Sequence, residues 1–589
     1  MKKNFLYILS LVILSFGLSS CLFEDDVVGT ELISGSFAGT SEVHLGNADK
    51  IDFMIEISEE GFNAAYDSLS NIFGQILTTQ FSLRGGKQGQ FPGEHAYQYQ
   101  YSLVTDNYAG YFTLPQDFGG RMVSTYYDSH DFNGGPGGSF SEVKKPLVPL
   151  LNHPQIDSIP EIKAIALLLY NASAHEMADA YGPFPYADFK ANKQSAPFTY
   201  NTVEMIYKTI VTNIDTIVAC LKHFENRPDW YKTKVYDILM FNDVSSNMMT
   251  QDMSEWVKYA NSLKLRLAMH IVKVEPETAQ KWAEEAVASG VIEIPEEEFK
   301  LEPMMIGFAH PLYVISNTWN DTRLNASLET ILRCLNHGYL DFVFDKNGFD
   351  IVNYHDNTKF LPAKTRIVGL RTGIRMMPGQ GYAVNFRAAY SVINKNVQYK
   401  PLHLMKLSEV QFLRAEGALR GWNMGGSAEH FYNLGVENAF YGDPYEAKYK
   451  ETLNEYMSLE TAKPYEYIDP YNDYYNMTSE VKIGVKWNNA DDNETKLEKI
   501  ITQKYIANFP NSHEAWVELR RTGYPKIFPV VHDDGDGSIE PGDIIRRIPF
   551  TGDSDPATKA DIESSGIEAL GGPDVQGTRL WWDVRKGNF

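Results

Sequence analysis

The chain has 589 residues, of which 43% are hydrophobic and 13% aromatic, so it is long enough for a large core and too long for one minimal domain. Its formal net charge is −23, from 53 Lys and Arg residues against 76 Asp and Glu residues. We therefore expect no nucleic-acid partner, because phosphate backbones require a basic face.

The N-terminus has the pattern of an export signal. Lys2 and Lys3 precede an apolar run over residues 5–18. This run is too short and too close to the terminus to span a bilayer as a stable helix, so it predicts a signal peptide over residues 1–20.

The residues that follow resemble a bacterial lipobox. Leu18-Ser19-Ser20-Cys21 is such a sequence, and there the cysteine is lipidated and becomes the first residue of the mature protein. We expect Cys21 to anchor a mature domain of residues 21–589. The acidic run at 23–26 resembles the surface-export signal of such lipoproteins, although it equally fits a solvated tether. Only Cys220 and Cys334 remain, and we expect both to be small buried apolar residues rather than a disulfide framework.

Helical periodicity dominates the rest of the chain. The patterns form about four helical hairpins separated by long irregular segments, which favours a mostly α, tetratricopeptide-like scaffold. The strict repeat consensus is absent and the spacing between pairs is uneven. The paired segments are 162–181 with 203–221, 256–271 with 276–290, 407–420 with 427–441, and 497–509 with 514–522.

Capping signals mark the ends of the last pair. Thr495 with Glu498, and Asn511 with Glu514, have the spacing of capping boxes. Pro510 is expected to end the first helix of the pair, and Gly523 the second. Small residues in the 407–441 pair, among them Gly435, predict a close approach of its two helices.

Several of these segments resemble the SusD/RagB family of Bacteroidetes nutrient-binding outer-membrane lipoproteins. The resemblance implies a SusD-like fold, in which the helical hairpins pack against an irregular, loop-rich second part. It also implies a protein that binds an oligosaccharide or a peptide for a SusC-like, TonB-dependent transporter. The matching segments are DAYGPFPY (179–186), EWVKYANSLKLRLAMHI (255–271), LSEVQFLRAEGALR (407–420), LEKIITQKYIANF (497–509), EAWVELRRTGYP (514–525) and WWD (581–583).

The candidate ligand residues lie between the helical pairs. Trp319, Asp321 and Arg323 form a W-x-D-x-R pattern, with Asn320 between them, which resembles an element near the ligand face of this family. Sugar rings stack on aromatic faces, while amides, carboxylates and guanidinium groups bond their hydroxyls. Structural packing of Trp319 remains the alternative. Further candidates are four tyrosines, two of them in the unusually aromatic stretch 97–112: Tyr108, Tyr111, Tyr126 and Tyr127.

Motifs for catalysis are missing from the sequence. It contains no HExxH, no G-x-S-x-G, no P-loop and no Cys/His ligand cluster, so we expect neither an enzyme nor a cofactor, although paired carboxylates for glycoside cleavage stay open. The acidic stretch 532–538 has alternating oxygen ligands at Asp534, Asp536 and Ser538. An EF-hand would need Glu where Ile545 stands, so we favour a plain acidic turn over a calcium loop.

One rival interpretation belongs to a different functional class. A helical-repeat lipoprotein could hold protein partners and bind no nutrient. An aromatic ligand cleft would favour nutrient binding, whereas a continuous groove lined with polar residues would favour assembly. A peptide-binding member of the same family is the third alternative.

Overall fold

The computed structural model describes residues 43, 45–76, 93–115, 126, 135–241, 252–301, 310–348, 366–375, 384–441, 451–532, 535–550 and 555–589. The chain divides into two compact units, Met1–Ser36 and Phe37–Phe589, and every described residue belongs to the second. The predicted signal peptide and the predicted lipid-anchor residue Cys21 therefore lie outside the described residues.

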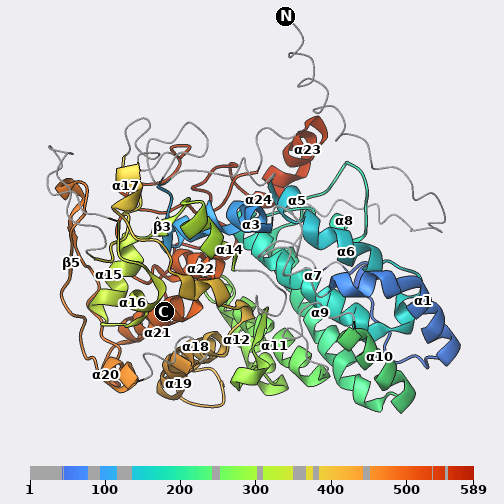
Figure 1. The fold of residues 1–589 in the computed structure, drawn as a ribbon. Helices are drawn as coiled ribbons and strands as arrows, with labels where there is room; N and C mark the ends of the chain where they lie inside the picture. Colours follow the sequence, from blue (N-terminus) through green and yellow to red (C-terminus); the bar gives the residue numbers. More distant parts are fainter. Residues whose placement is uncertain are drawn as a thin grey trace, which may run out of the picture. The chain divides into compact units, whose positions relative to one another are not determined.

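Helices dominate the described part of the chain, which confirms the predicted fold class (Figure 1). The longer helices carry the apolar periodicity noted in the sequence, and α7 is buried on every side. They are α1 (Glu59–Ile76), α6 (Ser141–Leu151), α7 (Pro160–Tyr181), α9 (Val203–His223), α10 (Asp229–Phe241), α11 (Met253–His270), α12 (Pro276–Ser289), α15 (Ala326–Cys334), α18 (Leu407–Leu419), α19 (Ala428–Tyr441), α21 (Asn493–Asn508) and α22 (Ser512–Thr522).

The four predicted helical pairs all form. Helix α7 packs on α9, α11 on α12, α18 on α19 and α21 on α22. The pairs are joined laterally, because α11 also contacts α9 and α18, and α18 contacts α21. Figure 1 shows α7, α9 and α11 side by side, in cyan to green. One hydrophobic core runs through these helices and includes the fully buried rings of Trp256 and Trp516.

Short elements make up the second, loop-rich part. Three two-stranded antiparallel sheets pair β1 (Phe112–Thr113) with β3 (Arg323–Leu324), β2 (Phe299–Leu301) with β4 (Leu402–Met405), and β5 (Glu466–Tyr467) with β6 (Met477–Thr478). The short helices are α3 (Gly93–Tyr97), α4 (Thr105–Tyr108), α5 (Gly135–Ser139), α8 (Tyr186–Lys190), α14 (Pro311–Tyr313), α16 (Tyr339–Val343), α17 (Val384–Ala388), α20 (Leu453–Met457), α23 (Pro556–Asp561) and α24 (Ile567–Leu570).

Helices α18 and α19 approach closely at a glycine. A Cβ atom on Gly435 would lie 2.6 Å from the ring of Phe412, closer than any normal carbon contact. Only a residue without a side chain leaves room for this aromatic ring, so the small-residue prediction for this pair is confirmed at Gly435.

Buried ion pairs connect the hairpins. The guanidinium of Arg521 donates to both carboxylate oxygens of Glu416, at 2.8 and 2.7 Å, and so joins α22 to α18. Arg266 on α11 donates to Glu409 on α18 at 2.7 and 2.9 Å. These four residues are 3% exposed or less, so the packing of the hairpins depends on charge pairing as well as on apolar contact.

The predicted capping boxes of the last pair are wrong. Helix α21 begins at Asn493, and the carboxylate of Asp492 accepts a hydrogen bond from the Thr495 amide at 2.7 Å. The N-cap Asn511 of α22 makes no capping bond, since Glu514 instead accepts from the buried Lys504 ammonium at 2.7 Å. The Glu514 carboxylate thus belongs to a buried ion pair and not to a cap of α22. Gly523 does end α22, in the left-handed conformation with φ of 78°.

Candidate functional site

Trp319 lies in a cluster of aromatic rings at the edge of the loop-rich part. Its backbone ends the π-helical turn η7 (Val314–Thr318), and its indole is partly buried against the core. The imidazole of His95, on α3, lies 4.7 Å from the Trp319 ring, between centroids. The ring of Tyr99 stacks on the His95 ring, with 5.6 Å between the centroids. We call these three residues the ring cluster.

The polar residues after Trp319 hold this loop in place. Asn320 is exposed and adopts a positive φ of 61°, which Asn tolerates better than most residues. The Asp321 carboxylate accepts a hydrogen bond from the Gln98 side chain at 2.8 Å. This bond ties the loop to the segment that carries His95 and Tyr99, so Asp321 positions the ring cluster.

Arg323 is buried in β3 at 2% exposure. Its guanidinium donates to the backbone oxygens of Arg387 (2.9 Å), Thr322 (2.8 Å) and Asn320 (3.2 Å), and to the Asn320 side-chain oxygen (3.2 Å). All four acceptors are neutral. Burial, and then the nearby Arg387 charge, lower the pKa of Arg323 to about 9, while Asp321 acts in the opposite direction.

A cavity of about 310 Å³ begins at Asn320, the residue that follows Trp319. This volume is at the lower end of the range for small-molecule sites, about 300–1,000 Å³. Its walls combine guanidinium, ammonium, amide, carboxylate and phenol groups with backbone, so it offers many hydrogen-bonding groups. The lining residues are Asn320, Arg323, Asp345, Lys346, Gly348, Arg387, Ala388, Tyr390 and Val392.

The tyrosine candidates lie elsewhere. Tyr108, Tyr111 and Tyr126 are at most 2% exposed and belong to the main core. Tyr108 packs on Trp516, with 5.3 Å between ring centroids, and the Tyr111 hydroxyl donates to the backbone of Tyr505. Their buried rings present no face to a ligand in this structure, because α22 and α21 cover Tyr108 and Tyr111, and Tyr126 packs on Tyr108 at 5.7 Å between ring centroids. Tyr127 lies outside the described residues.

The sequence interpretation missed several members of the site. His95 and Tyr99 stand at the start of the aromatic stretch at 97–112, and a search for rings just before and within that stretch could have found them. The sequence around Lys346 and around Arg387 has no motif that marks either residue as part of a ligand site. They reach the cavity through long-range pairing of the chain, for example the hydrogen bond from the Asp345 amide to the Val392 carbonyl at 2.9 Å.

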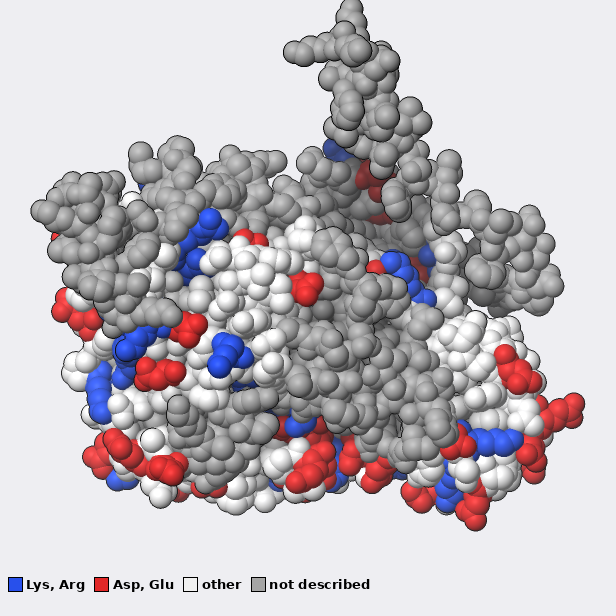
Figure 2. All heavy atoms as spheres, viewed as in Figure 1, with Lys and Arg blue, Asp and Glu red and all other residues white. Residues whose placement is uncertain are grey.

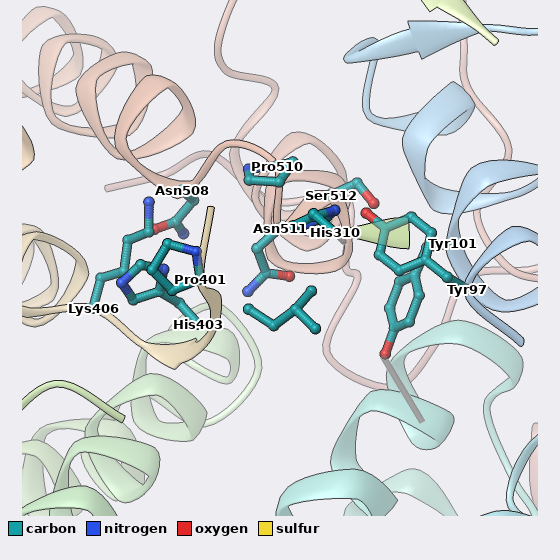
Figure 3. A pocket seen from close by; sticks show the side chains of 11 residues that line it. Tyr97, Tyr101, His310, Pro401, His403, Lys406, Asn508, Pro510, Asn511 and Ser512 are labelled. Carbon is teal, nitrogen blue, oxygen red and sulfur yellow. The ribbon is translucent and has the colours of Figure 1, made fainter. Parts of the chain in front are cut away.

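A second, much smaller cavity of about 30 Å³ lies among the helices (Figure 3). Figure 3 shows Tyr97 and Tyr101 on one side and His403 and Asn508 on the other. This volume holds about two water molecules and no sugar ring. Both side-chain polar atoms of Asn508 lack a hydrogen-bond partner among the described residues, so water is the fitting occupant.

A third hollow, of about 240 Å³, lies near the C-terminus beside the partly buried Trp581. It lacks a ring pair like that of His95 and Trp319 among its described lining residues, which include Arg579 and Leu580. Its single indole nevertheless makes it the natural control for the ring cluster.

The described residues bring together no three His, Cys, Asp or Glu side chains that could hold a metal ion. Asp533 and Asp534 of the acidic stretch lie outside them. Both carboxylate oxygens of Asp536 accept backbone hydrogen bonds, one from the Ser538 N–H at 2.9 Å and the other from the distant Gln576 N–H at 2.8 Å. Within the same residues, the longest apolar helices fall short of what a bilayer crossing requires.

Comparison with known proteins identifies the family to which this fold belongs. The family model described as SusD-like, "Susd and RagB outer membrane lipoprotein", matches residues 47–583. No curated protein matches the chain. A chitin-binding SusD homolog from Flavobacterium johnsoniae is 30% identical, with a TM-score of 0.72 over 90% of this chain and 100% of the other.

Two further solved structures agree. A SusD homolog from Bacteroides vulgatus is 25% identical, with a TM-score of 0.72 over 90% of this chain and 100% of the other. A SusD homolog from Bacteroides thetaiotaomicron is 28% identical, with a TM-score of 0.71 over 87% and 99%. The family match spans most of the sequence and the fold agrees over the same region, so the chain belongs to the SusD and RagB family of outer membrane lipoproteins.

Proposed function

We propose that this protein binds an oligosaccharide at the ring cluster and the adjoining cavity, and delivers it to a SusC-like, TonB-dependent transporter of the outer membrane. The observation that carries the proposal is the ring pair of His95 and Trp319, whose tryptophan directly precedes Asn320 in the wall of a cavity lined by hydrogen-bonding groups. Sugars present apolar ring faces and polar edges, and both find partners here. The chitin-binding relative supports a glycan over a peptide.

Binding without turnover is part of the proposal. The side chains of the ring cluster and cavity position and bind a ligand, and the sequence has no catalytic motif beside them. Incubation of the pure protein with a bound glycan should leave the glycan intact. Cleavage of many ligand equivalents per protein would contradict this.

The site is tested by Trp319→Ala. Loss of one aromatic hot spot costs about 2 kcal/mol, or about thirtyfold in affinity. We expect that loss in titrations against chito-oligosaccharides and a wider glycan array, with little change in melting temperature. The control is Trp581→Ala, which removes a partly buried indole beside another cavity.

The two variants discriminate between sites. Lost binding in Trp581→Ala with full binding in Trp319→Ala would move the ligand to the C-terminal hollow. A large drop in melting temperature for Trp319→Ala would show that its indole serves packing.

We further propose that residues 1–20 are removed as a signal peptide and that Cys21 carries the lipid, with the domain of residues 21–589 facing the cell surface. The family description as outer membrane lipoproteins supports this assignment. In Cys21→Ala the protein should leave the outer-membrane fraction. Retention there would refute the anchor, and protease treatment of whole cells tests the orientation.

A further inference from the structure

We propose that the cavity beside Trp319 binds an acidic substituent of the glycan, the carboxylate of a sugar acid or a sulfate ester. This inference rests on the proposed function and adds the chemical class of the ligand. It comes from the charges that line the cavity, which differ in sign from the protein as a whole.

Arg323 is an exception among the buried arginines of the described chain. Every other one has a carboxylate partner or lies over an aromatic ring. Those with a carboxylate are Arg227 with Glu161, Arg266 with Glu409, Arg414 with Glu293, Arg521 with Glu416, Arg546 with Asp543 and Arg547 with Asp574. Those over a ring are Arg371, on Phe528, and Arg520, on Trp516.

Arg323 has neither kind of partner within the described residues. Its guanidinium donates only to neutral oxygens, and it lines the cavity. A buried cation without a counter-ion is costly, and an anion in the cavity would offset that cost. Four of the five N–H groups of Arg323 already donate to these neutral oxygens, which leaves one N–H of the guanidinium for a carboxylate or sulfate oxygen.

Two more cations line the same cavity. Arg387 is partly buried and Lys346 is exposed, and among the described lining residues Asp345, also exposed, supplies the one carboxylate. Burial lowers the pKa of Arg323 most, and repulsion from the Arg387 charge lowers it further, against the smaller opposite effect of Asp321. Lys and Arg atoms also appear at the upper left of Figure 2, over the region where Figure 1 labels α17 and β3.

The net charge of the chain makes this local excess informative. A protein of formal charge −23 repels an acidic ligand at long range. A neutral ligand would need no cluster of cations at its site. An acidic ligand requires one, and its binding should weaken with ionic strength, since the partly exposed charges are screened by salt.

The experiment compares matched ligands on the purified full-length lipoprotein in detergent. The probes are oligogalacturonate with its carboxyl-reduced neutral counterpart, and 6-O-sulfated with unsulfated chito-oligosaccharide. We expect at least one acidic member to bind about tenfold more tightly than its neutral partner, the gain of one charge-assisted hydrogen bond. Which pair shows the difference identifies carboxylate or sulfate.

The variants assign the difference to this cavity. Arg387→Gln and Lys346→Gln should each reduce the preference for the acidic ligand, measured as the ratio of the acidic to the neutral affinity. Both change side chains at the surface of the cavity, so the test does not depend on the folding of an Arg323 variant. Arg585→Gln removes one positive charge from an exposed pair elsewhere and should change nothing.

Three outcomes would overturn the inference. Equal affinity for acidic and neutral glycans refutes the acidic substituent but leaves the proposed function intact. An acidic preference that persists in both variants refutes this cavity. Binding of an oligoglutamate peptide, with no binding of any glycan, refutes an acidic glycan and the proposed function together.

Discussion

The carboxylate of Asp106 offers a sensitive test of the core. It lies on α4, fully buried where that helix packs on α22. Neither of its oxygens has a hydrogen-bond partner among the described residues. Burial raises the pKa of Asp106 from 3.8 to about 7, since a charge is unfavourable in this environment, and the nearby Ser512 hydroxyl offsets the rise only in part. The folded protein therefore holds a proton here that the unfolded chain releases near pH 4.

The sign of the pH dependence follows from proton linkage. Below the unfolded pKa both states are protonated, and the Asp106 contribution is fully present. As the pH rises from about 4 to about 7, Asp106 loses its proton in the unfolded chain but keeps it in the folded protein. This deprotonation favours the unfolded state, so the free energy of unfolding falls. Since one pKa unit is worth about 1.4 kcal/mol, the difference of about three units amounts to roughly 4 kcal/mol.

The substitution Asp106→Asn removes this titration and keeps the shape of the side chain. We expect the variant to be more stable than the parent at about pH 8, by up to roughly 4 kcal/mol, and similar to it at about pH 4. Urea unfolding at several pH values measures the difference. Asp492→Asn is the control, because that exposed carboxylate has a lowered pKa and Asn also caps helices well.

The result that would refute this reasoning is a variant less stable than the parent at pH 8. That outcome would mean that the Asp106 carboxylate is ionised and satisfied in the folded protein. A constant difference at all pH values would equally exclude a titration at this position.

Two further predictions concern the hairpin scaffold. Glu416→Gln should lower the free energy of unfolding by up to about 3–5 kcal/mol in urea titrations, because it removes one of the two buried carboxylates that pair with Arg521 and leaves only Glu518. Burial acts to raise the pKa of Glu416, but the charges of Arg521 and Arg420 outweigh it and lower this pKa from 4.5 to about 2. The stabilisation by Glu416 is therefore lost as the pH falls from about 4.5 toward 2. Unchanged stability of Glu416→Gln would contradict the pairing. Gly435→Ala should cost about 1–3 kcal/mol, because its Cβ would meet Phe412; an unchanged melting temperature would show that the two helices separate freely.

The scaffold and the site are linked through short elements. Strand β3, which carries Arg323, pairs with β1, and Asp321 is bonded to Gln98. The ring cluster is thus fixed from two segments more than 200 residues apart in the chain, as the separation of Gln98 and Asp321 shows. A site assembled in this way is held by the fold rather than by local sequence.

The sequence by itself determined the helical scaffold. Apolar periodicity specifies which face of each helix is buried, so the four hairpins and the burial of Trp256 and Trp516 could be predicted. Family-specific segments along the chain also indicated the family, which the comparison confirms. The position of Gly435 between two helices followed from residue size alone.

Tertiary structure alone decided which polar and aromatic residues reach a surface. Tyr108 and Tyr111 stand in an aromatic, non-periodic segment, yet α21 and α22 cover them. Glu514 has the spacing of a capping-box residue, but in the structure its carboxylate pairs with the buried ammonium of Lys504. Arg387 joins Arg323 only through long-range pairing of the chain. Periodicity reports the burial of a helix face, whereas exposure in irregular segments depends on distant neighbours that local sequence does not encode.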